Sequence, residues 1–144
     1  MKKYLQLSFV LLVGLFAQAQ APQKMTYQAV IRNASNTLLT NTSIGTQISI
    51  LQGSAMGTPS YVETQIILTN ANGLATFQIG AGVTVSGTIA GINWGNGPYF
   101  IKTETDPLGG TNYTINGTTE LLSVPYALYA ENGPVGPTGP QGPI

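Results

Sequence analysis

Residues 61–79 read YVETQIILTNANGLATFQI, and this stretch decides the fold class. β-Branched and aromatic residues are frequent over 61–69, as is typical of a β-strand. The segment 70–73 (NANG) predicts a turn, because Asn and Gly tolerate the positive φ angles that tight turns need. Apolar and polar residues alternate again over 75–79, so the stretch predicts a β-hairpin. On the first strand of this hairpin, one face carries Glu63 and Gln65 and the other carries Val62 and Ile66.

Short strands of the same kind are predicted on both sides of the hairpin. Ile44, Ile48 and Ile50 alternate with polar residues, which predicts a half-buried strand over 44–51. Turn residues recur about every 8–12 residues, a spacing typical of antiparallel sandwiches. The sequence therefore predicts an all-β fold, a single antiparallel β-sandwich of prealbumin or immunoglobulin type over residues 20–131. Further strands are predicted over 27–32, 99–105, 112–115 and 118–124, a helical turn over 88–94 that tucks Ile89, Ile92 and Trp94 under the sheet, and a short helix over 125–130.

The first nineteen residues are predicted to be a cleaved secretory signal helix. Two lysines near the start precede a mostly apolar run over 4–16, and Ala17-Gln18-Ala19 follows as a cleavage site. A transmembrane helix needs about 20 apolar residues, so the run is too short for an anchor. No Cys follows that could carry a lipid. We therefore expect export, a secreted or cell-surface location, and no membrane contact after cleavage of residues 1–19.

The last residues repeat with a period of three. Residues 133–144 form four Gly-Pro-X triplets, and residues 132–144 are predicted to be a collagen-like tail. Three polyproline-II chains can wind together only when every third residue lacks a side chain, so the repeat predicts a homotrimer. Four triplets span only about 37 Å, so we expect this tail to be the truncated start of a longer repeat. The glycines at the predicted triple-helix axis are Gly133, Gly136, Gly139 and Gly142.

Composition excludes several classes of function. The 144 residues contain no His and no Cys, which removes imidazole catalysis, thiolate nucleophiles and the common zinc sites. Five basic and five acidic residues give no basic patch for a nucleic acid. We therefore expect a non-enzymatic protein without catalytic residues, cofactor or metal, and without a nucleic-acid partner.

Acidic side chains offer little chemistry. Glu104 and Asp106 share a strand face by their spacing and resemble the paired carboxylates of a glycosidase. Adjacent acids at a strand end are more often a solvated edge, so catalysis is the weaker interpretation. Asp106 with Asn112 and loop carbonyls would suit calcium, but a single fixed carboxylate favours a plain turn.

Aromatic residues supply two candidate contact sites. Trp94, Tyr99 and Tyr113 would stack against a sugar if they shared a surface; filling a small sandwich core is the commoner role of such rings. The second candidate precedes the first triplet, where a triple helix needs its chains brought into register. There we expect a trimer contact, with docking on the chain's own sandwich as the alternative. Its residues are Tyr126, Leu128 and Tyr129.

Several strings together resemble a known domain. The strings are MTYQAV (25–30), TNANGL (69–74) and LLSVPYA (121–127), of which the last is the most specific. The chain from about 22 to 131 resembles the N-terminal domain of secreted collagen-like and tail-fibre-like surface proteins of Bacteroidota. The resemblance implies a signal peptide before the domain and a fibre segment after it, and it implies no catalytic residue. The string around 69–77 is also similar to prealbumin-like modules related to the carboxypeptidase regulatory domain.

Two functions follow as expectations. The first is an exported structural protein whose head domain caps, and trimerises, a collagen-like stalk at the cell surface. The second is a prealbumin-like binding module that recognises a glycan or a surface protein through exposed aromatic residues. Exposure of Trp94 and Tyr113 discriminates between them, because a buried ring cannot stack against a ligand.

Overall fold

The computed structural model describes residues 23–122, which form seven strands and two short 3₁₀ turns. The predicted all-β class is confirmed: the strands form two antiparallel sheets that face each other as a sandwich. No helix in this range is long and apolar enough to cross a membrane. The elements are β1 (Met25–Val30), β2 (Ser43–Gln52), β3 (Thr58–Leu68), β4 (Leu74–Ile79), β5 (Val83–Gly87), η2 (Ile89–Gly91), η3 (Trp94–Asn96), β6 (Tyr99–Asp106) and β7 (Ile115–Glu120).

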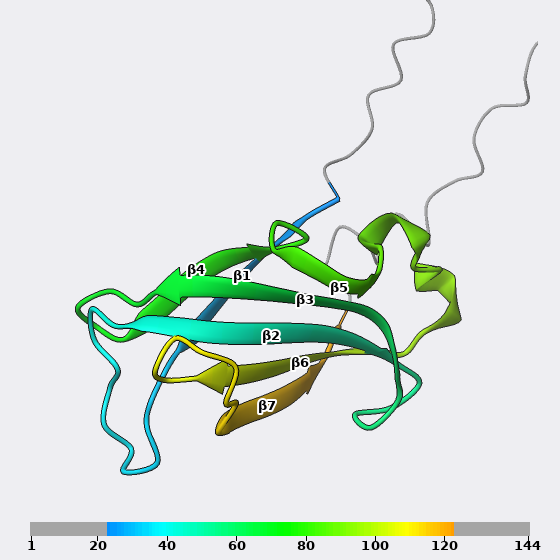
Figure 1. The fold of residues 1–144 in the computed structure, drawn as a ribbon. Coiled ribbons are helices and arrows are strands. Elements are labelled where there is room, and N and C mark those ends of the chain that lie inside the picture. The colour runs from blue at the N-terminus through cyan, green and yellow to red at the C-terminus, as the bar shows by residue number, and fades with distance from the viewer. Residues whose placement is uncertain (1–22, 123–144) are drawn as a thin grey trace, which may run out of the picture.

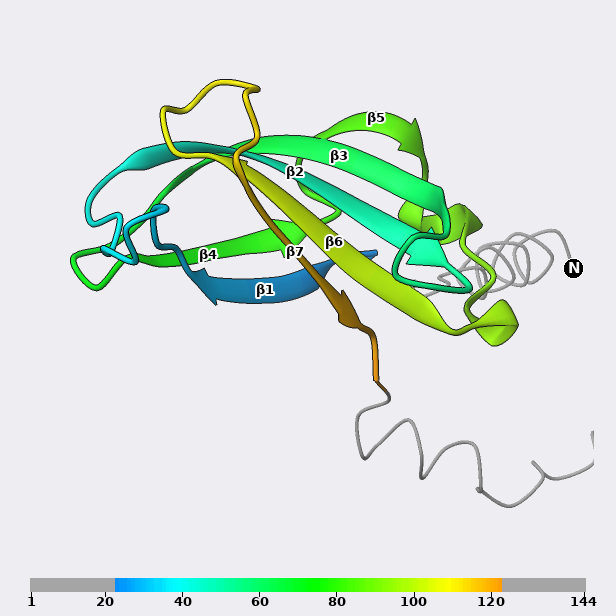
Figure 2. The same ribbon diagram turned by 90° about the horizontal axis from the view of Figure 1, so that it is seen from below.

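The two sheets are unequal. The larger has the strand order β5-β3-β2-β6-β7, and the smaller consists of β1 and β4 alone (Figure 1). Figure 2 shows the small sheet as a separate layer along the large one. One face of the large sheet therefore packs on β1 and β4 as its inner face, and the other is an outer face.

The hairpin predicted over 61–79 is wrong in its pairing. The turn at 70–73 forms as predicted, with the Asn70 Oδ1 atom accepting hydrogen bonds from the Asn72 and Leu74 N–H groups. The chain then leaves the large sheet, because β4 pairs with β1 and not with β3. Ile67 of β3 and Ala75 of β4 meet in one core cluster across the sandwich. The turn thus links the two layers.

The core lies between the layers in two clusters. The larger contains Ile48 and Ile50 of β2, as the alternation predicted. Tyr27 of β1 and Phe77 of β4 line the opposite wall, with ring centroids 5.4 Å apart. The predicted helical turn appears as η2 and η3, and it buries Ile89 and Ile92 as expected.

Other boundaries differ from the predictions. The sequence did not predict β5, which follows two glycines and is exposed along its whole length. Residues 112–114 belong to a loop, so β7 starts at Ile115 and replaces the two strands predicted there. Strand β2 was predicted to be half-buried, but both of its faces are covered along most of its length.

A buried carboxylate holds the second crossing between the sheets. Glu63 of β3 has no exposed surface, and no cationic side chain among residues 23–122 contacts its carboxylate. Its Oε2 atom accepts hydrogen bonds from the Tyr61 hydroxyl (2.8 Å) and the Gly82 N–H (2.9 Å). The Gly80 N–H and the Gln65 amide supply the remaining donors. Because buried polar groups are costly unless they are paired, these bonds fix the segment that carries the chain from β4 to β5.

Tyr61 is adapted to this role as a donor. Burial raises the pKa of its phenol, and the hydrogen bond to Glu63 raises it further. The hydroxyl therefore keeps its proton and continues to donate to the carboxylate at neutral and mildly basic pH.

We expect Glu63→Gln to lower the free energy of unfolding by about 2–4 kcal/mol, because an amide NH₂ would face backbone donors that have no other partner. Urea denaturation of the folded domain measures this change. Glu104→Gln is the matched control: it breaks an ion pair with Lys102 on the outer face of the same sheet, and we expect a loss of about 1 kcal/mol or less. An equal loss in both variants would contradict the role of Glu63.

Candidate functional site

The outer face of the large sheet carries apolar residues where a solvated face normally carries polar ones. Strand β3 turns Glu63 and Gln65 inward, so Ile66 and Leu68 point outward. Ile66 is 66% exposed and Leu68 is 69% exposed. On the neighbouring edge strand Val83 is 73% exposed, and it pairs with Thr64 of the same outer face. The inner face of β3 thus carries the polar Glu63 and Gln65 between the core residues Tyr61 and Ile67, while the outer face ends in exposed aliphatic residues.

The loop between β6 and β7 covers part of this face. It lies on Gly45 of β2, where an added Cβ would collide with the carbonyl oxygen of Gly110. Gly45 is opposite Ile66 on β3 and Asp106 on β6, so the loop crosses the central strand near one end of the sheet. Glycine is required at 45 because a side chain would lift the loop from the sheet.

Asp106 organises this loop. Its carboxylate is buried, with Oδ1 accepting from the Leu108 N–H and Oδ2 from the Asn112 N–H, each at 2.9 Å. These backbone hydrogen bonds lower the pKa of Asp106, against the opposing effect of desolvation. Its oxygens thus bind N–H groups, and residues 23–122 contain no cluster of metal-ligating side chains. The plain turn favoured by the sequence accounts for the geometry.

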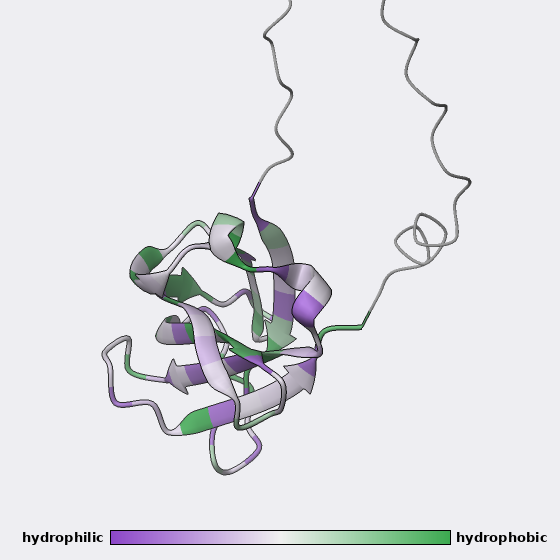
Figure 3. Cartoon of the chain, turned by 90° about the vertical axis from the view of Figure 1, so that its right-hand side faces the viewer, coloured by the Kyte–Doolittle hydropathy of each residue, from purple (hydrophilic) through white to green (hydrophobic). Residues whose placement is uncertain are grey.

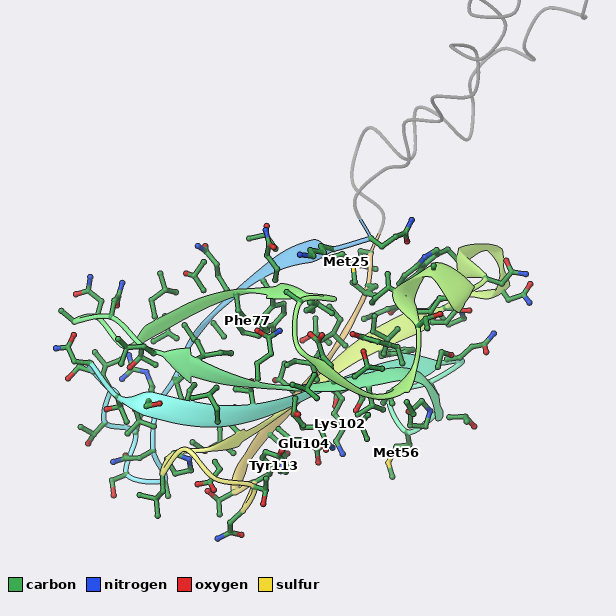
Figure 4. The ribbon with its side chains drawn as sticks, turned by 45° about the horizontal axis from the view of Figure 1, so that its top comes forward. Met25, Met56, Phe77, Lys102, Glu104 and Tyr113 are labelled. Carbon is green, nitrogen blue, oxygen red and sulfur yellow. The ribbon has the colours of Figure 1, made fainter. Side chains whose placement is uncertain are left out.

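Glu104 is engaged in the same way. Its Oε1 atom contacts the Lys102 Nζ atom at 2.8 Å, and its Oε2 atom accepts from the Gln47 amide at 3.1 Å. Figure 4 shows Lys102, Glu104 and Tyr113 on the side of the large sheet away from Phe77. The acidic pair of the sequence analysis is therefore part of the outer face, with each carboxylate committed to partners in the fold.

A groove of about 210 Å³ separates the loop from β3 and β5. Tyr113 forms the loop side of the groove, and Ile66 and Val83 form part of the sheet side. Among the described residues the Tyr113 phenol is the one ionisable group that lines it, so the groove suits an apolar or neutral occupant. The other lining residues are Gly45, Thr46, Thr64, Gln65, Gly109, Gly110 and Thr111.

A second hollow of about 510 Å³ lies between the β1–β2 and β6–β7 loops, beside Arg32 and Asn116. Both hollows border the β6–β7 loop, at the end of the sandwich where Figure 1 also shows the β3–β4 turn. The described chain begins and ends toward the other end, where Met25 and Leu121 pack against the same core cluster. Figure 3 shows the apolar end of the described chain as a green stretch extending from the domain.

The three aromatic residues predicted as a ligand platform do not share a surface. Trp94 is 44% exposed and packs edge-on against Tyr99, with ring centroids 5.2 Å apart. Tyr99 is 5% exposed and donates its hydroxyl to the Asn93 carbonyl, so it belongs to the core. Tyr113 follows the far end of β6 and lines the outer groove. The expectation that Trp94 lies under the sheet is wrong, because no residue of η3 is buried and its indole is partly in solvent.

The remaining predicted sites lie outside the described residues. These are the signal peptide over 1–19, the trimer-contact residues Tyr126, Leu128 and Tyr129, and the glycines Gly133, Gly136, Gly139 and Gly142. Sequence reasoning missed the apolar half of the outer face. The signal was present in Val62, Ile66 and Leu68, which share one face of the strand with Thr64, but periodicity does not tell which face of a strand is inside.

We expect the stabilising contribution of Asp106 to depend on pH. Because folding lowers its pKa, the contribution is complete above the ordinary value of 3.8 and is lost as pH falls through the folded pKa. The difference in free energy of unfolding between wild type and Asp106→Asn should therefore be largest near neutral pH and shrink below about pH 4. Chemical denaturation at several pH values measures it. Asn112→Ala is the control, since it keeps the backbone donor and should retain the wild-type pH dependence; a difference that grows toward low pH would contradict the assignment.

Comparison with known proteins places the domain in a family. The sequence model of a family described as a domain of unknown function, DUF8740, matches residues 26–122. No curated protein and no solved structure matches the chain. The matched range covers about two thirds of the 144 residues and runs from β1 to the end of the described chain. The chain therefore belongs to the DUF8740 family.

Proposed function

We propose that this protein is an exported, non-enzymatic structural protein whose sandwich is the head domain of a collagen-like stalk. In this proposal residues 1–19 direct export, the sandwich caps the stalk at the cell surface, and three chains assemble through the tail. The resemblance to secreted collagen-like and tail-fibre-like proteins of Bacteroidota supports the same function. The finer assignment of the sandwich to the prealbumin or immunoglobulin type is part of this proposal.

One observation carries the proposal: four Gly-Pro-X triplets follow the domain without interruption. A glycine at every third position is the steric requirement of the triple helix, and a proline after each glycine restricts φ to values near those of the polyproline-II conformation. Only ten residues, 123–132, separate the last described residue from the first triplet. The repeat therefore starts close to the domain, as a stalk below a head domain would.

The arrangement of the domain supports a head at the end of a stalk. Leu121 follows β7, and its N–H donates to the Tyr99 carbonyl at 2.8 Å. This contact places the exit of the chain at the end of the sandwich opposite the β6–β7 loop. In the proposed assembly that loop and its two hollows face away from the stalk.

The acidic side chains support the non-enzymatic part. Glu63, Glu104 and Asp106 are each bonded within the fold, to backbone N–H groups or to neighbouring side chains. General acid–base catalysis needs an ionisable group that is free to reach a substrate proton. These three carboxylates instead form hydrogen bonds or an ion pair that connect strands and loops of the domain.

We expect the exported chain, residues 20–144 with its repeat extended by further Gly-Pro-X triplets, to form a trimer. Sedimentation equilibrium should give the mass of three chains, and circular dichroism should show a polyproline-II signal that melts cooperatively, because the triple helix is stable only as an assembly. The control replaces the repeat glycines by alanine, which blocks close packing at the axis. A monomer at high micromolar concentration would refute the trimeric stalk.

A second candidate function is the prealbumin-like module that binds a glycan or a surface protein. The observation that favours it is the partial exposure of Trp94 and Tyr113. The two rings lie toward opposite ends of β6, so each would have to act alone. A single stacked ring contributes about 1 kcal/mol, which makes a strong glycan site at either position harder to build.

The structural proposal expects that no glycan-array signal of the exported protein depends on Trp94. A signal that disappears in Trp94→Ala, while the thermal unfolding temperature stays unchanged, would instead support the binding module. Tyr113→Ala is the matched comparison, because it removes the aromatic ring at the other end of β6. If both variants lose the glycan-array signal and also unfold at a lower temperature, the loss would be due to damage to the fold.

A further inference from the structure

We propose that the outer surface of β3 and β5 is the contact through which each head domain packs against a second copy of this chain in the trimer. We call this surface the β3–β5 patch and define it by Ile66, Leu68, Val83 and Val85. The inference rests on the proposed trimeric stalk and specifies which part of the head domain its neighbour covers.

The exposed aliphatic end of the outer face of β3 is the first argument. A strand with one face in a core and one in water places apolar residues inside and polar residues outside. In β3 the inner face contains a fully buried Glu63, whereas the outer face exposes two thirds of Ile66 and Leu68. Each aliphatic side chain of this size gains about 1.5–3 kcal/mol when it is buried. Contact with another protein surface would recover this free energy.

The contrast across the same face is the second argument. On the β6–β7 half most outward residues are polar or charged, among them Lys102, Glu104 and Thr118, and the half-buried Phe100 is the exception. On the β3–β5 half they are aliphatic, and β5 is an edge strand that contains neither a charged residue nor a proline. Natural edge strands commonly carry such residues to prevent association with other chains. The exposed aliphatic residues of the outer face are therefore concentrated on the β3–β5 half, which has the composition of an interface.

The groove beside the patch is the third argument. Ile66 and Val83 line it together with Tyr113, so the apolar surface continues from the sheet onto the β6–β7 loop. A concave, uncharged surface beside exposed aliphatic residues can accept a protruding apolar side chain. Tyr is enriched among the residues that dominate binding energy at interfaces.

The tail identifies a second copy as the occupant. The triplets require three chains at one axis, and residues 123–132 extend to at most about 35 Å between that axis and Leu122. Three head domains are therefore held side by side. A short tether raises the effective concentration of each domain near its neighbours to about the millimolar range, so a modest apolar patch suffices for stable contact.

Cysteine crosslinking tests this contact directly, because the chain contains no native Cys. The test uses the exported chain with its extended repeat and a single Val83→Cys substitution, treated with a short bis-maleimide. We expect covalent dimers, with the third thiol of each trimer left unpaired. Thr118→Cys is the matched control: it is exposed on the outer face near the opposite edge of the same sheet, and we expect about tenfold less crosslinking there.

Charge substitution provides an independent readout. Ile66→Lys combined with Val83→Lys would place charges in the contact, and we expect the concentration of half-dissociation to rise about tenfold or more. Asn116→Lys combined with Thr118→Lys adds the same charge to the β6–β7 half and should leave association unchanged. Circular dichroism checks that both variants fold. If the variant with lysines at Ile66 and Val83 does not fold, the Val83→Cys crosslinking result alone tests the β3–β5 contact.

The outcomes separate this inference from the proposed function. A trimer that crosslinks at Val83 and is weakened by lysines in the patch supports both. A trimer that crosslinks equally at Val83 and Thr118, or not at Val83, overturns the β3–β5 contact. The same result still supports the proposed trimeric stalk. A wild-type chain that stays monomeric overturns both, including the case in which residues 123–131 cover the patch of their own domain.

Discussion

The arrangement of the sandwich depends on the hydrogen bonds to one buried carboxylate. Glu63 ties β3 to the Gly80 and Gly82 backbone, and this segment returns the chain from the small sheet to the large one. Without that return β5 would not pair with β3, and the edge that carries Val83 would not form. A carboxylate without a counter-ion is an uncommon choice for a core. Here four donors satisfy it, two from β3 and two from the segment between β4 and β5, so the same group that costs free energy on burial also specifies the topology.

Sequence patterns predicted the local structure well and the long-range pairing poorly. The alternation of Ile44, Ile48 and Ile50 identified β2, and the turn at 70–73 appears where Asn and Gly indicated it. The pairing of β4 failed because a turn signal does not encode which sheet the following strand joins. Strand β5 was missed because its start among glycines resembles a loop. For the candidate surface, the sequence analysis identified Tyr113 but not Ile66 and Val83. These two residues line a groove with Tyr113 because the β6–β7 loop folds back over the sheet.

The outer face of β3 links the fold to the proposed assembly. Its inner face holds Glu63 and Gln65 between core residues, and its outer face ends in the exposed Ile66 and Leu68. In an isolated domain these aliphatic side chains would stay in water, whereas in the proposed assembly both faces of β3 are covered. The scarcity of charge over the chain is consistent with surfaces that meet other protein.

The direction of β7 has a mechanical consequence in the proposed assembly. The strand runs toward the end of the domain at which the chain leaves, so tension on the stalk acts along the strand axis. The hydrogen bonds between β7 and β6 lie across that axis. A pull therefore shears the whole ladder at once instead of opening it bond by bond. The load then passes through β2 and β3 toward the opposite edge, so the head domain would resist extension as a single sheet.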